Sequence, residues 1–218
     1  MIRAALLDVD GTLLASNDAQ ARSWSDALAE NGHPAEYDAI RRSIGLGGDR
    51  LLRSVAGLDE NQEPGKTISR RRLEIFLERY AAGLAPTPGA RALVAWLRER
   101  GTRIVIATGA TAAEVDTLLR SAGIDDLIDA TVTADDAAQT KPAPDIVLAA
   151  LERAGVPAAD AVMIGDTPYD VISAQAAAVQ AIALRCGGWS DADLAGASVF
   201  ANPQELLERY RESPLRAL

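Results

Sequence analysis

Short apolar runs recur along this chain, and segments with helical character separate most of them. Runs of this length that do not alternate with polar residues are typical of strands buried on both faces of a sheet. Strands that alternate with helices favour parallel pairing, with helices covering both faces. The runs lie at 4–9, 103–108, 127–133, 161–166 and 181–184, with helices expected at 111–122, 144–154 and 168–177. The sequence therefore predicts an α/β fold with a doubly wound, Rossmann-like parallel sheet.

The stretch between the first two apolar runs has a different character, because it contains no convincing strand. Its pattern predicts helices at 18–31, 35–43, 48–56 and 66–82. An all-helical block inserted after the first strand is typical of a lid, and the Gly- and Pro-rich segment GLAPTPG at its exit is typical of a linker. We therefore expect an α/β core formed by 1–15 and 87–218 and an inserted all-α cap formed by 16–86.

Composition argues against several classes of partner. The 218 residues carry a formal net charge of −9, with an isoelectric point near 4.7. Nucleic acids and anionic membrane surfaces demand a basic face, so we expect neither as a partner. No apolar run approaches the roughly 18 residues of a membrane span, and no leader is apparent. The single cysteine, Cys186, is expected to be a small buried residue. A chain with one cysteine has no disulfide framework, which suits a cytoplasmic location. The oligomeric state is left open.

The first apolar run ends in two acids, Asp8 and Asp10, within the segment LLDVDGTLL. Side chains alternate along an extended strand, so these two point to the same side. Ligands of a doubly wound sheet bind beyond the carboxyl ends of its strands. Two acids this close together are costly to bury unless they share a cation, and a cap or turn role explains only one of them.

Three further strand ends carry side chains of matching chemistry. Thr108 and Gly109 offer a hydroxyl and backbone N–H groups that can hold an oxyanion, although a helix N-cap by Thr108 is the stronger interpretation of that residue alone. Lys141 is one of two lysines among twenty arginines, which indicates a need for a compact point charge. Asp166 and Asp170 follow a fourth run, where Asp166 alone also fits a helix cap.

Together these strand ends supply what phosphoryl transfer needs. Carboxylates and other hard oxygen atoms are the ligands that Mg²⁺ prefers, fixed donors hold phosphate oxygens, and one carboxylate remains free to attack. The sequence therefore predicts a Mg²⁺-dependent site for a small phosphorylated metabolite.

Four motifs occur in the order found in one enzyme superfamily. They are DVDGT (8–12), ATG (107–109), KPAPD (141–145) and GDTPYD (165–170). The chain resembles, over its whole length, the haloacid dehalogenase superfamily of hydrolases, in its phosphatase branch with a helical cap (phosphoglycolate phosphatase and β-phosphoglucomutase-like). This resemblance implies a phosphatase that hydrolyses a small phosphomonoester.

The resemblance also implies roles for the acids. Asp8 would be the nucleophile that forms an aspartyl-phosphate, and Asp10 the general acid and then base. Asp8, the backbone carbonyl of Asp10 and Asp166 would hold Mg²⁺, with Asp170 close by or bound through water.

Phosphate and substrate contacts follow from the same resemblance. Thr108 and the Gly109 amide would bind phosphoryl oxygens, and Lys141 would offset the negative charge between nucleophile and phosphate. The cap segment RRSIGLGGDRLL (41–52) resembles a substrate-specificity loop, in which Gly47 and Arg50 are candidate substrate contacts. A solvated helix face is an equally good interpretation of Arg50, and we expect one for the run 70–72.

Several other functions remain to be weighed. A sugar-phosphate mutase of the same family often has a histidine where this chain has Gln20, which argues against mutase activity. A dehalogenase lacks the second acid that Asp10 supplies, and the only cap lysine, Lys66, is poorly placed for phosphonate cleavage. A response-regulator receiver has no helical insertion. A non-catalytic phosphate- and Mg²⁺-binding regulator would be expected to have lost one of these groups, and none is lost.

Overall fold

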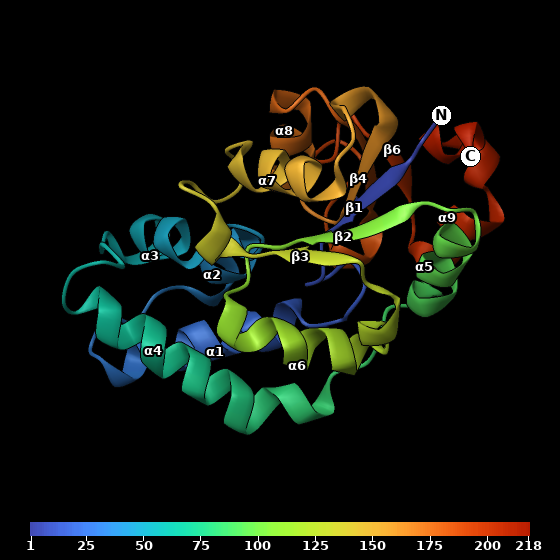
Figure 1. Ribbon diagram of the computed structural model, residues 1–218. Helices are drawn as coiled ribbons and strands as arrows, with labels where there is room; N and C mark the ends of the chain where they lie inside the picture. Colours follow the sequence, from blue (N-terminus) through green and yellow to red (C-terminus); the bar gives the residue numbers. More distant parts are fainter.

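The computed structural model describes all 218 residues and contains a six-stranded, fully parallel sheet (Figure 1). The strands are β1 (Ala4–Leu7), β2 (Arg103–Ala107), β3 (Ala130–Val132), β4 (Ala161–Gly165), β5 (Gln180–Leu184) and β6 (Ser198–Phe200). Their order is β3-β2-β1-β4-β5-β6, so β1 is central and pairs with β2 and β4. All five predicted runs form strands, and the predicted fold class is confirmed. The edge strand β6 was not predicted.

Helices cover both faces of this sheet, as the continuous apolar strands require. The helices α7 (Asp145–Ala154) and α8 (Pro168–Ala176) pack on one face, and α5 (Ala90–Glu99), α6 (Ala112–Ala122) and α9 (Pro203–Glu208) lie on the other. Side chains of β1 alternate between two apolar cores. Ala4 and Leu6 belong to the core beneath α7 and α8, whereas Ala5 and Leu7 belong to the core beneath α5 and α6.

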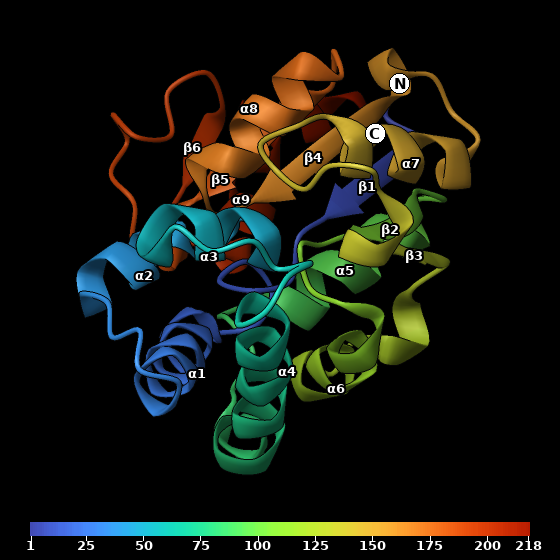
Figure 2. The same ribbon diagram turned by 90° about the vertical axis from the view of Figure 1, so that its left-hand side faces the viewer.

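Four helices between β1 and β2 form a separate group at one end of the sheet (Figure 2). They are α1 (Asn17–Glu30), α2 (Tyr37–Ser43), α3 (Gly48–Ala56) and α4 (Gly65–Ile75), and a π-helical turn (Phe76–Tyr80) extends α4. The group has an apolar cluster of its own, which includes Trp24, Ile40 and Ile68. No strand of the central sheet lies between 16 and 86. The assignment of these residues to a separate cap domain stays a prediction.

No helix is both long enough and apolar enough to cross a membrane. Location in the cytoplasm stays a prediction.

Candidate active site

The end of β1 is shaped by a tight turn that brings two loops together. Asp8 follows the strand directly, and its backbone N–H still donates to Ile164 O on β4 at 2.9 Å. Gly11 has a φ of +77°, a conformation that L residues rarely adopt. A Cβ atom at Gly11 would lie 2.2 Å from Oδ2 of Asp166. Glycine is therefore required here, because any side chain would displace a carboxylate of the site.

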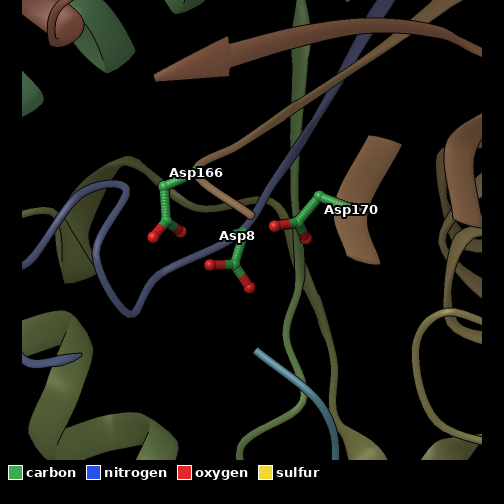
Figure 3. A group of neighbouring side chains, drawn as sticks. All are labelled: Asp8, Asp166 and Asp170. Atoms are coloured by element: carbon green, nitrogen blue, oxygen red, sulfur yellow. The ribbon is translucent and has the colours of Figure 1, made fainter. Parts of the chain in front are cut away.

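Three carboxylates from different elements meet beside this turn (Figure 3). Asp8 follows β1, Asp166 follows β4, and Asp170 lies in the first turn of α8. One oxygen atom from each lies within 4.8 Å of the others. Lys141, fully buried, has its Nζ 2.7 Å from both Asp8 Oδ1 and Asp170 Oδ1.

The charges of this cluster do not balance within the protein. If all three carboxylates are ionised, one ammonium group leaves two negative charges in a buried place where uncompensated charge is costly. Carboxylate oxygens are the donors that Mg²⁺ prefers. The donor set and its charge therefore fit a divalent cation of this kind.

Burial and mutual repulsion control the protonation of these groups. Burial raises the pKa of Asp8 to about 7, against the lowering effect of Lys141 and with a further increase from Asp170. Burial also raises the pKa of Asp166, and the charges of Asp8 and Asp170 add to this effect. Burial alone would lower the pKa of Lys141, but Asp170 and Asp8 outweigh it and raise this pKa. Lys141 therefore stays charged.

The acids at the start of α8 have different partners. Thr167, not Asp166, is the N-cap of α8, and its hydroxyl and the Asp170 carboxylate form a capping box. Asp166 instead accepts hydrogen bonds from Thr12 Oγ1 and Asn17 Nδ2, both at 2.9 Å. The interpretation of Asp166 as a helix cap is therefore wrong.

Thr12 and Asn17 are site residues that the sequence pattern did not predict. Thr12 lies within the DVDGT motif, whose position at a strand end could have identified it. Asn17 is the first residue of α1, and the fold brings it close to Asp166, which is distant in the sequence. No local sequence pattern therefore identifies Asn17 as a site residue.

The loop after β2 also leaves its polar groups available. Thr111 caps α6 with Glu114 in a capping box, so the interpretation of Thr108 as the N-cap is wrong. The buried Thr108 hydroxyl accepts a hydrogen bond from Ala110 N at 3.1 Å, and its proton is free for another acceptor. Gly109 lies close to the loop between α2 and α3, where a Cβ atom would be 3.5 Å from Leu46 O.

Asp10 lies in an environment that differs from that of Asp8. Its Oδ1 accepts hydrogen bonds from Ser16 Oγ at 2.5 Å and from Gln20 Nε2 at 3.0 Å. Burial raises the pKa of Asp10, and the charge of Glu114 raises it further. A carboxyl group with a raised pKa can carry a proton near neutral pH.

Arg72 is not on a solvated helix face, so the expectation for the run 70–72 is wrong at this position. Its Nη1 lies 2.9 Å from both carboxylate oxygens of Glu114, and another guanidinium N–H donates to Gln20 Oε1. Both Arg72 and Glu114 are buried. Arg72 is buried because α4 packs beside α6, and the helical pattern of α4 alone does not show this packing. Arg70 is exposed, as expected.

A cavity of about 720 Å³ lies between the helices of residues 16–86 and the strand ends. Asp8, Asp10, Thr108 and Gly109 form part of its lining, together with residues of α1, α3, α4 and α6. The candidate substrate contacts Gly47 and Arg50 are not among the lining residues.

The two candidates outside the cavity lining have partners of their own. A Cβ atom at Gly47 would lie 2.2 Å from Cγ2 of Thr140, which explains the glycine. Arg50 Nη2 donates to Gln139 Oε1 at 3.0 Å. A substrate role for either residue stays a prediction.

Cys186 is exposed, so the expectation of a small buried residue is wrong. It lies in a surface turn (Arg185–Gly187) that follows β5, and its Sγ donates to Gly11 O at 3.2 Å. The thiol therefore contacts the turn that shapes the site without belonging to an apolar core.

The parallel sheet, the helical insertion after its first strand and the buried acid–lysine cluster at the strand ends are the features expected from the resemblance to a hydrolase superfamily. The family model of haloacid dehalogenase-like hydrolases matches residues 2–178, and the chain belongs to that family.

Known proteins of similar sequence and structure agree with this assignment. The phosphoglycolate phosphatase of Rhodospirillum rubrum is 35% identical over 195 residues, which cover 86% of this chain and 81% of that protein. The chloroplastic protein SUPPRESSOR OF QUENCHING 1 of Arabidopsis thaliana is 35% identical over 189 residues, but this match spans 84% of the chain and only 18% of that protein. A hydrolase from Pseudomonas syringae of known crystal structure superposes with a TM-score of 0.87 at 29% identity, covering 96% of this chain and 98% of that one.

Proposed function

We propose that the protein is a Mg²⁺-dependent phosphatase that hydrolyses a small phosphomonoester through an aspartyl-phosphate on Asp8. One observation carries this proposal. The carboxylate of Asp8 lines the cavity beside Thr108, is paired with Lys141 at 2.7 Å, and lies within 4.8 Å of oxygens of Asp166 and Asp170. The similarity to a phosphoglycolate phosphatase supports phosphate esters as the class of substrate.

The ligands of Mg²⁺ would be Asp8, Asp166 and the backbone carbonyl of Asp10, with Asp170 close by. When bound, the ion offsets the negative charge of the nucleophile and of the phosphoryl oxygens. Lys141 adds a fixed positive charge 2.7 Å from Asp8 Oδ1. Thr108 and the backbone N–H of Gly109 hold phosphoryl oxygens, because both face the cavity at a strand end.

The reaction then proceeds in two steps, transfer of the phosphoryl group to Asp8 and its hydrolysis. In the first, an oxygen of Asp8 forms a bond to phosphorus, the bond from phosphorus to the leaving oxygen breaks, and Asp10 gives its proton to that oxygen. In the second, Asp10 takes a proton from water as the water oxygen bonds to phosphorus. The bond between phosphorus and Asp8 breaks, and inorganic phosphate leaves.

Hydrolysis is favoured over transfer between sugar phosphates. Gln20 stands where a mutase of this family often has a histidine; its amide nitrogen donates to Asp10 and its amide oxygen accepts from Arg72. An amide side chain does not ionise near neutral pH, so Gln20 can orient Asp10 but cannot act as an acid or base. A regulator without catalysis is not favoured either, because every group that the reaction needs is present.

Phosphate release from an aryl phosphate, with and without Mg²⁺, tests this function. We expect activity that depends on Mg²⁺, disappears in excess chelator and returns when Mg²⁺ is restored. Asp8→Asn should be inactive, whereas Asp125→Asn, which removes an exposed acid outside the cavity, should behave as the wild type. Undiminished activity in excess chelator would refute the proposal.

A further inference from the structure

The cavity wall beyond the reacting carboxylates is acidic. Asp49, Glu60 and Asp135 belong to its lining, and none of the three forms an ion pair. The two arginines of the lining do not balance them. Arg72 is already neutralised by Glu114, which leaves Arg70 as the one positive charge free of a carboxylate partner.

Each of these three acids is held by one neighbour and keeps one oxygen free. Asp49 Oδ1 accepts from Thr140 Oγ1 at 2.7 Å, and Glu60 Oε1 accepts from Ser69 Oγ at 2.6 Å. Asp135 Oδ2 accepts from the backbone of α6 at 2.8 Å. The second oxygen of each carboxylate has no donor within the protein. These acids therefore present fixed hydrogen-bond acceptors to whatever occupies the cavity.

The same acids oppose any second negative charge on a ligand. Burial raises the pKa of Glu60, and the charges of Asp49 and Asp135 raise it further, against the lowering effects of the Ser69 hydroxyl and the Arg72 charge. At an effective dielectric constant near 20, two like charges about 6 Å apart change an equilibrium constant by about 100-fold, and salt reduces this effect. Arg70 and Asp135 are both exposed to solvent, which weakens the field of each, so the half-buried Asp49 and Glu60 contribute most of the repulsion.

We propose that the leaving group of the substrate is an alcohol that bears hydroxyl or ammonium donors and no second anion. This inference rests on the proposed phosphatase function and deepens it. Asp49 and Glu60, on the cap side of the cavity, accept hydrogen bonds from the leaving group. Phosphate esters with a carboxylate or a second phosphate, phosphoglycolate included, are poor substrates, although relatives of this chain are named for that ester.

Three two-carbon phosphate esters that differ only in their terminal group, a hydroxyl, an ammonium or a carboxylate, test the inference on the intact enzyme. They are 2-hydroxyethyl phosphate, phosphoethanolamine and phosphoglycolate, each assayed with Mg²⁺ at the same ionic strength. We expect kcat/KM for phosphoglycolate to be at least about 10-fold below that for the other two, with the gap narrowing as salt is added. An equal or higher value for phosphoglycolate would overturn the inference.

Failure of the inference and failure of the proposed function give different results. If an aryl phosphate is hydrolysed but the hydroxyl and ammonium esters are not, the inference about the leaving group is wrong and the phosphatase function stands. If no ester is hydrolysed with Mg²⁺ present, the proposed function is wrong and the inference falls with it.

Glu→Gln variants, which remove a charge and keep the size of the side chain, test whether the cavity wall sets the preference between these esters. Glu60→Gln should narrow the ratio between 2-hydroxyethyl phosphate and phosphoglycolate several-fold, because it removes one repelling charge from the cavity wall. Glu78→Gln removes an exposed charge from the same group of helices, outside the cavity, and should leave the ratio unchanged. If both variants changed the ratio equally, net charge and not the cavity wall would set the preference, and the inference would fail.

Discussion

Asp8 and Asp10 stand two residues apart, yet their partners suit them to different roles. The ammonium group of Lys141 lies 2.7 Å from Asp8, which favours the ionised form that a nucleophile needs. Asp10 has no such partner and receives hydrogen bonds from Ser16 and Gln20 instead. Burial raises the pKa of both acids, to about 7 for Asp8, so the difference lies in their partners: Lys141 and a bound cation favour ionised Asp8, whereas the charge of Glu114 adds to the raised pKa of Asp10.

The first prediction follows from this difference. Asp10→Asn should slow phosphate release from an alkyl phosphate by roughly 10²- to 10⁴-fold, the usual loss on removal of a general acid. The loss should be smaller for an aryl phosphate, because its leaving group needs less protonation. The measurement compares kcat for both esters in wild type and variant. Equal losses toward the two esters would show that Asp10 does not act as the acid.

Much of the site could be predicted, because parallel strands place their carboxyl ends at one edge of the sheet. Asp8, Lys141, Asp166 and Asp170 meet as that rule requires. Asn17 was missed because its hydrogen bond to Asp166 spans 149 positions of sequence and depends on how α1 leaves the turn. The catalytic and ligand roles of these residues stay predictions.

At the scale of elements, a buried ion pair joins α4 to α6. Arg72 on α4 contacts both carboxylate oxygens of Glu114 at 2.9 Å, and the two side chains are almost fully buried. Glu114 also accepts from the backbone of Thr111 at the start of α6. The pair therefore connects the inserted helices to α6, the helix that follows the loop of Thr108 and Gly109.

The second prediction concerns the stability of this connection. Arg72→Met should lower the free energy of unfolding by about 3–5 kcal/mol, because it leaves the Glu114 carboxylate buried without a counter-charge. Arg71→Met is the matched control: its ion pairs with Glu30 and Glu74 are accessible to solvent, so the loss should be much smaller. Urea unfolding measures both variants. Similar losses would contradict the buried pair.

At the scale of the whole molecule, the alternation of apolar runs and helices was sufficient to predict the sheet and the inserted helices. The edge strand β6 was not predicted, because it has only three residues, of which only Phe200 is fully buried. The contact between α4 and α6 was not predicted either, because it is a tertiary pairing of two helices with no local signal. Local periodicity thus predicts which elements form, but not which charged side chains they bury.

The third prediction links the acid cluster to global stability. The pKa of Asp8 rises from 3.8 to about 7 on folding, so the folded protein binds a proton that the unfolded chain has already lost between these values. Stability without Mg²⁺ should therefore fall as pH rises from about 4 to about 7. Mg²⁺ should restore it most strongly near pH 7, where the carboxylates are ionised.

Thermal unfolding at pH 5 and pH 7.5, with and without Mg²⁺, checks this linkage. Asp8→Asn should flatten the fall in Tm of the metal-free protein, because the substituted group no longer titrates. Stabilisation by Mg²⁺ that was equal at both pH values, or a Tm of the metal-free protein that rose across this range, would contradict the account.

Reductive trapping during turnover tests the central claim, the aspartyl-phosphate on Asp8, most directly. Borohydride reduces an acyl phosphate to an alcohol, so a phosphorylated aspartate acquires a distinct peptide mass. With an aryl phosphate and Mg²⁺ present, we predict reduction of Asp8 alone, and none when either is omitted. Turnover of the ester with Asp8 unmodified throughout, or with the modification on another carboxylate, would contradict the account.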